Sequence, residues 1–414
     1  MSATQGTARA AAGAAARRVP GARPLGSAIA RGIAGRVLGR TAAALRGCDW
    51  ILLAAALALS LFGTVMIWSA TAPALLQQGA SPHAFLLKQL LNIGLGLVLM
   101  LAVAAMDARQ LRLLAPVLYG ASCLGLLAVL TPLGTIVNGA RAWISLSGGF
   151  QIEPSEYAKL SVIVISAAVL SQPRRGENRP GPKAVGLTIL VAAVPLVLVI
   201  AEPALGVTIV LVLIAAGIIA LSGIRLRWLT GLAAAAALGV TAVVKLHLLK
   251  SYQVSRLTSF VNPAADPRGT GYSAAQAKIA IGSGGLHGTG LFRSGLIAGS
   301  FVPNQHTDFI FAVIGNELGF SGSLALIGLL GLLLYRALRI AARAQDQFGM
   351  LVASGIAIWF AVQAFINMGM TVGIMPVTGL PLPFVSYGGS AMFADMIAIG
   401  LLLAVSRRRS MFKQ

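Results

Sequence analysis

Ten long apolar runs, separated by short polar segments, make up most of the chain. A helix needs about 20 apolar residues to cross a bilayer, and strand-like alternation is not the prevailing pattern. The sequence therefore predicts an all-α membrane protein with about ten transmembrane helices. The runs lie near 50–71, 85–106, 113–131, 155–171, 184–201, 205–222, 228–249, 309–335, 348–370 and 386–406.

Composition agrees with this pattern. Charged residues make up only 10% of the 414 residues, and the mean hydropathy is +0.85, whereas a soluble domain carries about a quarter charged residues. The net charge of +21 resembles that of a nucleic-acid-binding protein. However, the basic residues cluster at the ends of apolar runs, as the positive-inside rule requires. We therefore expect the chain to lie in a membrane and not to bind nucleic acid.

Basic residues occur mainly in alternate loops, which predicts that both termini are cytoplasmic. Residues 1–49 carry eight arginines and no acid before Asp49, and they lack the apolar core of a signal peptide. We interpret them as a basic, largely disordered cytoplasmic tail, either touching anionic lipid headgroups or unconstrained. The loops of the basic set, with the C-terminal end, contain Arg109, Arg112, Arg174, Arg175, Arg179, Lys183, Arg225, Arg227, Arg336, Arg339, Arg343, Arg407, Arg408 and Arg409.

Three loops of the other set are too polar or too irregular to be simple connectors: 132–154, 250–307 and 371–385. The second is long enough to have structure of its own. Irregular backbone near a membrane is tolerated where it is buried in protein or lines a cavity. We therefore expect a site at the outer face.

Asp308 is the strongest single candidate for chemistry, because it lies where the long outer loop enters the eighth apolar run. A carboxylate close to water but with apolar neighbours can act as a general base. An aspartate at a helix start is equally well explained as an N-cap. Position alone leaves both interpretations open.

Basic side chains also lie on the outer side, against the positive-inside trend, and indicate an anionic ligand. Nearby, the glycine-rich run from Gly282 to Gly290 either cradles a phosphate with its backbone amides or only allows tight turns. The outer basic residues are Arg141, Arg256, Arg268, Lys278 and Arg293.

Several motifs in a fixed order make the chain resemble a known family. Over residues 50–410 it is similar to the SEDS family (shape, elongation, division and sporulation), which includes RodA and FtsW. The motifs are Asn138 to Trp143, Glu153 to Glu156 with Lys159, Asp266-Pro267, the glycine run, His306 to Phe309, Pro381 to Pro383 and Ser386 to Ser390.

The resemblance implies a peptidoglycan glycosyltransferase in the bacterial cytoplasmic membrane. Such enzymes polymerise lipid II at the outer face beside a class B penicillin-binding protein, a transpeptidase. The essential loop aspartate of the family matches Asp308. Arg141 and Lys278 would stabilise the leaving pyrophosphate, and the resemblance leaves open a divalent cation, Mg²⁺ or Mn²⁺. The implied substrate-binding residues are Arg141, Lys278, Trp143, Glu156, Lys159, Arg256, Ser386 and Tyr387.

Departures from the family pattern leave alternatives open. The usual Gln-Pro-Asp-Leu-Gly reads Glu202-Pro203-Ala204-Leu205-Gly206, so Glu202 either supplies the missing charge or faces water at a helix end. An elongation role like that of RodA is favoured over an FtsW-like division role. A lipid II flippase would place its charges near the midplane, unlike this chain, and a non-catalytic scaffold for a transpeptidase is the third alternative.

Overall fold

The computed structural model describes residues 48–137, 140–145, 151–172, 180–202, 204–224, 226–245, 251–262, 266 and 269–411. Residues 1–47 of the expected basic tail lie outside this part, and so do Asn138, Gly139, Pro203, Pro267 and Arg268 of the motifs and outer basic residues named above.

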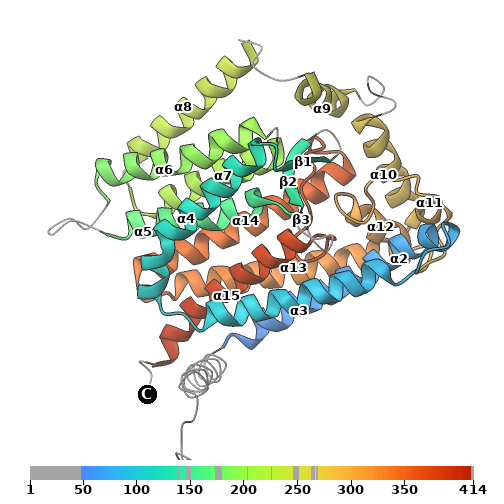
Figure 1. The fold of residues 1–414 in the computed structure, drawn as a ribbon, viewed down its shortest axis with the longest axis horizontal. Helices are drawn as coiled ribbons and strands as arrows, with labels where there is room; N and C mark the ends of the chain where they lie inside the picture. Colours follow the sequence, from blue (N-terminus) through green and yellow to red (C-terminus); the bar gives the residue numbers. More distant parts are fainter. Residues whose placement is uncertain are drawn as a thin grey trace, which may run out of the picture.

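Each of the ten predicted runs overlaps with helix in the described part of the chain (Figure 1). Within the described ranges, seven helices are long and apolar enough to cross a membrane, while α5 and α7 have 17 residues each. The predicted multi-pass helical architecture is thus confirmed. The elements that match the runs are α2 Trp50–Gln77, α3 Ala84–Ala104, α4 Ala108–Leu130, α5 Pro154–Leu170, α6 Pro182–Ala201, α7 Leu205–Leu221, α8 Leu226–Lys245, α12 Ile310–Glu317, α13 Gly319–Ala342, α14 Gln347–Val372 and α15 Gly389–Met411.

The eighth run is not one helix, as predicted, but two. The chain breaks between α12 and α13 at Gly319, whose φ of +66° favours glycine. A side chain there would collide with the backbone of the 286–288 turn, which packs against the break. As a result the short helix α12 is separate from the long α13.

Both long outer loops contain regular structure. The 250–307 loop holds α9 Ser251–Val261, α10 Thr270–Gly284 and α11 Gly295–Ala298. The 132–154 loop, which the sequence pattern left irregular, forms an antiparallel sheet in the order β1-β2-β3: β1 Gly134–Val137, β2 Ala140–Ser145 and β3 Gln151–Ile152. Ser390 attaches this sheet to α15, because its Oγ donates to the Gln151 carbonyl (3.0 Å) and accepts from the Glu153 N–H (2.9 Å).

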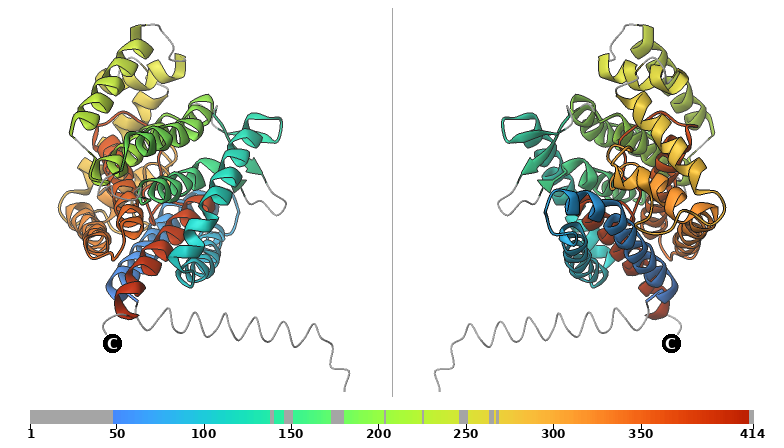
Figure 2. Two further views of the ribbon diagram at one scale, coloured as in Figure 1. Left: turned by 90° about the vertical axis from the view of Figure 1, so that its left-hand side faces the viewer. Right: turned by 90° about the vertical axis from the view of Figure 1, so that its right-hand side faces the viewer.

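The start of α2 and the end of α15 lie at the same end of the bundle, away from α9–α11 (Figures 1 and 2). Three ion pairs connect helix ends at this end of the bundle. The start of α2 and the end of α15 lie at one end, as an even number of membrane crossings requires. The pairs are Asp49–Arg336, Arg112–Asp346 (2.6 Å) and Arg407–Asp107 (3.0 Å).

Candidate active site

Asp308 and Arg256 meet at one glycine of the loop that joins α14 to α15, residues 373–388. A Cβ atom placed on Gly379 would lie 3.5 Å from Asp308 Oδ2 and 3.9 Å from Arg256 Nη1. The same Nη1 donates to the Thr378 carbonyl (3.1 Å). The structure therefore brings together the expected base and one expected substrate ligand, from the start of α12 and from α9.

The surroundings of Asp308 suit a general base. Burial raises the pKa of its carboxyl to about 6, while the Arg256 charge and a hydrogen bond with the Thr307 side chain oppose this rise. The side chain is half-buried. At neutral pH the carboxylate is therefore mostly ionised, with a pKa close to the working pH, as efficient proton transfer requires.

Lys278 lies at the other end of the same loop. Its exposed side chain extends from α10 over Gly373, the residue that ends α14, and its flexible end lies where a Cβ atom of residue 373 would be. The 373–379 part of the loop thus connects Lys278 to the Asp308–Arg256 pair. Two cationic side chains therefore flank this segment.

Asn367 of α14 holds the backbone of Asp308. Its Nδ2 donates to the Asp308 carbonyl (2.8 Å) and to the Leu380 carbonyl (2.6 Å). Asn367 is fully buried, and buried amides that bridge two carbonyls are costly to remove. One side chain therefore fixes the 373–388 loop relative to the candidate base.

Ser386 and Tyr387, both expected to bind substrate, hold this same segment. Ser386 Oγ donates to the Thr307 carbonyl (2.6 Å) and accepts from the Leu382 N–H (2.8 Å). The Tyr387 N–H donates to the His306 carbonyl (3.0 Å). Both residues therefore hydrogen-bond to the backbone of the segment that carries Asp308.

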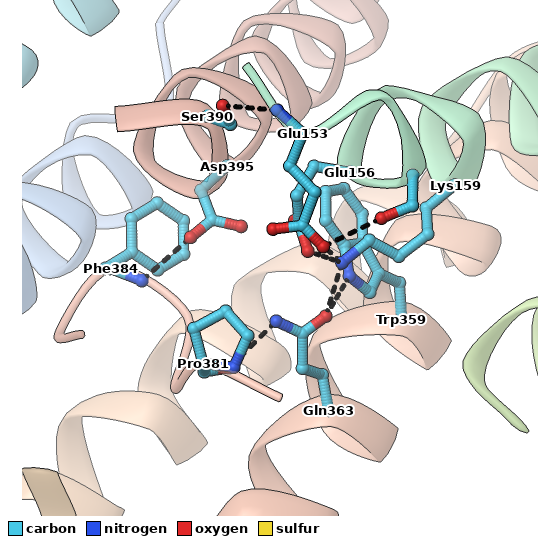
Figure 3. Close-up of polar contacts among 10 residues, drawn as sticks. Glu153, Glu156, Lys159, Trp359, Gln363, Pro381, Phe384, Ser390 and Asp395 are labelled. Atoms are coloured by element: carbon cyan, nitrogen blue, oxygen red, sulfur yellow. Dashed lines mark hydrogen bonds and ion pairs between the residues drawn. The ribbon is translucent and has the colours of Figure 1, made fainter. Parts of the chain in front are cut away.

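Glu156 and Lys159, also expected to bind substrate, form a buried ion pair. Lys159 Nζ lies 2.8 and 2.7 Å from the two Glu156 oxygens and 2.7 Å from Gln363 Oε1, with side-chain exposures of 0% and 1% (Figure 3). Trp359 Nε1 also donates to Gln363 Oε1 (2.6 Å), and Gln363 Nε2 donates to the Pro381 carbonyl (2.9 Å). In this structure neither charged group is open to a ligand, and both brace the loop through Gln363.

Two further carboxyl groups turn toward this ion pair, Glu153 and Asp395 (Figure 3). Asp395 Oδ2 accepts from the N–H of Phe384, whose φ is +64°. A non-glycine residue in that conformation costs about 1–3 kcal/mol and persists only where its surroundings impose it. Asp395 is therefore another anchor of the 373–388 loop.

Glu202 is buried, which excludes one of the two alternatives left open by the sequence, that it faces water at a helix end. Within the described ranges neither of its oxygens has a hydrogen-bond partner. Burial, and then the charge of Glu153, raise the pKa of Glu202 to about 8. A raised pKa favours the uncharged form of Glu202, which counts against the alternative that Glu202 supplies the charge missing at Ala204.

The described residues do not form a ready metal centre. No group of three or more His, Cys, Asp or Glu side chains in this part of the chain is arranged to hold an ion. A divalent cation held in part by the pyrophosphate of a substrate stays a prediction, and we assign no step to one.

Arg141 and Trp143 lie on β2. The Arg141 stem runs alongside Gly134 of β1. The Trp143 carbonyl accepts from Thr135 Oγ1 (3.0 Å). Both expected ligands therefore sit in the sheet, which Ser390 attaches to the start of α15.

The glycine run forms turns rather than an open cradle. The amides of Gly288, Thr289 and Gly290 donate to the carbonyls of Gly284 (2.8 Å), Asn316 (3.0 Å) and Glu317 (3.0 Å). These three amides are occupied by the chain itself. The tight-turn interpretation therefore describes this segment.

Sequence reasoning missed Gln363 and Asn367. Only ionisable residues within the apolar runs were considered, yet both amides interrupt the ninth run. They are four residues apart and so share one helix face. Polar side chains in membrane helices commonly bond across to neighbouring segments, and this spacing was the signal available.

The fold and site define a multi-pass helical membrane protein with a half-buried carboxylate beside cationic side chains at one end. The chain belongs to the FtsW/RodA/SpoVE family: the family model described as "Cell cycle protein" matches residues 49–411.

Named relatives cover most of the chain. Peptidoglycan glycosyltransferase MrdB of Escherichia coli K12 is 37% identical over 358 residues, 86% of this chain and 93% of that protein. Probable peptidoglycan glycosyltransferase FtsW of Halothiobacillus neapolitanus is 40% identical over 376 residues, 88% of this chain and 87% of that protein.

Solved structures agree. A chain from a structure titled "Structural coordination of polymerization and crosslinking by a peptidoglycan synthase complex" has a TM-score of 0.72 and 34% identity, covering 87% of this chain and 98% of that one. The rod shape determining protein RodA of Thermus thermophilus has a TM-score of 0.63 and 31% identity, covering 87% and 97%. The family resemblance found in the motifs is thus confirmed.

Proposed function

We propose that this chain is a peptidoglycan glycosyltransferase that polymerises lipid II at the outer face of the bacterial cytoplasmic membrane. The enzyme class follows from its family, whose relatives carry that name. The site assignment rests on the half-buried Asp308 carboxylate. It lies near Arg256 at Gly379, and Asn367 holds the backbone carbonyl of Asp308.

The proposed reaction is a single displacement. The 4-hydroxyl oxygen of an acceptor GlcNAc attacks C1 of the donor MurNAc, and Asp308 accepts the hydroxyl proton. The bond between C1 and the pyrophosphate oxygen breaks, and undecaprenyl pyrophosphate leaves with inversion at C1. A positioned base of this kind contributes about 10²–10⁴-fold in rate.

Cationic side chains would stabilise the charge that develops on the leaving pyrophosphate. Lys278 is exposed and flanks the 373–379 segment, so it is the best placed of the three candidates. Arg256 has the further effect of lowering the Asp308 pKa. Arg141 remains a proposed ligand that would act from the sheet.

We further propose a class B penicillin-binding protein as partner, cytoplasmic termini and a role in elongation. The complex described in the solved-structure title above supports a transpeptidase partner. The shared end of α2 and α15 supports the topology. Sidewall rather than septal localisation of a tagged protein would support elongation, and septal localisation would favour a division role.

Polymerisation of purified lipid II by the purified full chain tests the activity. We expect wild type to make glycan strands and Asp308→Asn to lose about 10²–10⁴-fold in rate. Asp107→Asn is the matched control, because Asp107 is an exposed acid paired with Arg407 at the opposite end. Equal rates for wild type and Asp308→Asn would defeat the assignment of the base.

The rival functions give different results in the same experiment. A flippase would make the lipid II headgroup accessible across liposomes without forming polymer. A scaffold would do neither alone and would act only through its transpeptidase. Polymer made by the isolated chain and lost in Asp308→Asn fits the polymerase alone.

A further inference from the structure

Three aromatic rings meet at the segment that carries Asp308, and the proposed mechanism does not use them. We call them the aromatic cluster: Phe85 from the start of α3, His306 from the segment before α12, and Tyr387 from the end of the 373–388 loop. The ring centroids of Phe85 and His306 lie 5.1 Å apart, those of Phe85 and Tyr387 4.9 Å, and those of His306 and Tyr387 5.8 Å. The cluster therefore joins three separate segments of the chain close to the candidate base.

The rings leave part of their surface open. Phe85 meets the other two edge to face, at interplanar angles of 62° and 70°, and His306 is tilted by 57° from Tyr387. None of the three pairs is stacked face to face, so the rings do not cover one another's faces. All three residues are half-buried. The aromatic cluster thus still presents ring surface to the outside of the protein.

Two polar groups of the cluster are available to a ligand. Among the described residues, the Tyr387 hydroxyl and the His306 ring nitrogens have no hydrogen-bond partner, and these atoms remain open to the surface. Burial lowers the pKa of His306, so its imidazole is neutral at neutral pH and can donate one hydrogen bond and accept another. The aromatic cluster therefore offers apolar surface and hydrogen bonds, but no charge.

A pyranose ring fits this combination of groups. One face of a GlcNAc ring carries axial C–H bonds that pack on an aromatic ring, while its hydroxyl and N-acetyl groups form hydrogen bonds around the edge. Ligand sites commonly combine aromatic side chains with a few placed polar groups in this way. A pyrophosphate would instead need the positive charge that the cluster lacks.

The position of the cluster along the 373–388 loop selects one of the two reacting sugars. The cationic side chains flank residues 373–379, where the proposed mechanism needs them for the pyrophosphate of the donor. Tyr387 lies at the other end of the loop, where its N–H holds the His306 carbonyl (3.0 Å). The two kinds of side chain thus belong to different parts of one loop, which leaves the cluster to the sugar whose hydroxyl Asp308 deprotonates.

We propose that the aromatic cluster is the subsite for the acceptor GlcNAc. Its pyranose ring packs on the ring surface of the cluster and forms hydrogen bonds with the Tyr387 hydroxyl and the His306 imidazole. The inference rests on the proposed polymerase function and names the residues that hold the acceptor sugar. Binding there orients the 4-hydroxyl toward Asp308, a contribution of positioning rather than of proton transfer.

Lipid II saturation curves for two Tyr387 variants of the full chain test the subsite. Tyr387→Phe keeps the ring and removes the hydroxyl, so the half-saturating lipid II concentration should rise about two- to ten-fold, the equivalent of one hydrogen bond. Tyr387→Leu also removes the ring and should raise it about ten-fold or more, with a smaller change in kcat. Both variants keep the backbone N–H that holds the His306 carbonyl, so the loop stays attached.

Tyr335→Leu is the matched control. It makes the same substitution at a tyrosine of α13 that is 57% exposed and lies next to Arg336 at the opposite end of the bundle, so it should saturate like wild type. Equal half-saturation for Tyr387→Leu and wild type would overturn the proposal. A loss of kcat with unchanged half-saturation would also overturn it, because the cluster would then only support the fold of the site.

Binding of a soluble sugar separates this inference from the proposed function. Saturation-transfer NMR with the disaccharide GlcNAc–MurNAc, which has no lipid, pyrophosphate or peptide, needs no turnover. We expect saturation of the GlcNAc ring protons by wild type and Tyr335→Leu, and its loss in Tyr387→Leu. No transfer from wild type, or equal transfer from Tyr387→Leu, would overturn the subsite even where wild type polymerises lipid II. The expected transfer without any polymer from wild type would overturn the polymerase and leave a sugar site.

Discussion

The buried Glu156–Lys159 pair offers the sharpest test of how the site is supported. We consider Glu156→Leu, Lys159→Met and the double variant. Either single change leaves one charged group in a position with 0–1% exposure. Removing one partner of a buried pair costs about 3–5 kcal/mol, whereas replacing both with apolar residues of similar size is often neutral or stabilising.

The structure also predicts how each variant affects activity. Lys159 holds Gln363 Oε1 at 2.7 Å, but Trp359 Nε1 holds the same oxygen at 2.6 Å. Gln363 therefore keeps one partner in the double variant and can still bind the Pro381 carbonyl. Loss of one hydrogen bond to a charged group costs about 1.5–3 kcal/mol at most, so we expect the double variant to polymerise lipid II at about a tenth to a hundredth of the wild-type rate.

Unfolding in mixed micelles with increasing sodium dodecyl sulfate measures stability, and lipid II polymerisation measures activity at equal amounts of folded protein. We expect a coupling of several kcal/mol between the two positions. Two results would refute the reasoning. Losses that simply add in the double variant would show that the pair is not coupled. A stable double variant with no activity would show that these charges contact lipid II directly, as the family resemblance first implied.

Four further predictions follow from the site. The polymerisation rate should fall as pH drops through about 6, because Asp308 must be deprotonated to accept a proton and its pKa is raised to about 6; a flat profile from pH 5 to 8 would contradict this. Arg141→Ala and Arg141→Lys should both weaken lipid II use, because lysine lacks the bidentate fork, and wild-type saturation curves for both would make Arg141 structural. Asn367→Ala should lower kcat by about 10-fold or more, with a smaller change in KM, since it removes the hydrogen bonds to the Asp308 and Leu380 carbonyls together. Asn367→Asp, measured under the same conditions, should lower kcat further, because it adds a buried charge. If Glu202 supplies the charge missing at Ala204, Glu202→Gln should lower activity and adding Ala204→Asp should restore much of it, with a coupling of about 0.5–3 kcal/mol. An active Glu202→Gln would leave only a packing role, which the raised pKa of Glu202 favours.

The helical framework could be predicted from sequence because membrane helices give a strong local signal. Long apolar runs and alternating arginines placed each run on a helix. The break at Gly319 gave no such signal, since the apolar run continues through it. It arises where the 286–288 turn of the preceding loop packs against the chain. The hydropathy pattern does not report such tertiary contacts.

The candidate site was predicted in part for the same reason. Asp308 and Lys278 were identifiable as charges in unusual places. The bond from Lys159 to α14 was not, since its partner Gln363 is 204 residues away. The three strands of the 132–154 loop have only four, six and two residues, too short for a periodic pattern, and Ser390 anchors them from a position about 240 residues later.

The side-chain amides of α14 make this helix the support of the candidate base. Gln363 and Asn367 lie one turn apart and reach Pro381, Leu380 and Asp308 from a single rigid element. A slide of α14 along its axis would therefore carry the loop and the base together, and a displacement of 1 Å can cost about 10²-fold in rate. Phe365 on the same helix is 56% exposed, so a neighbour that packs against it would act on the same element that holds the base.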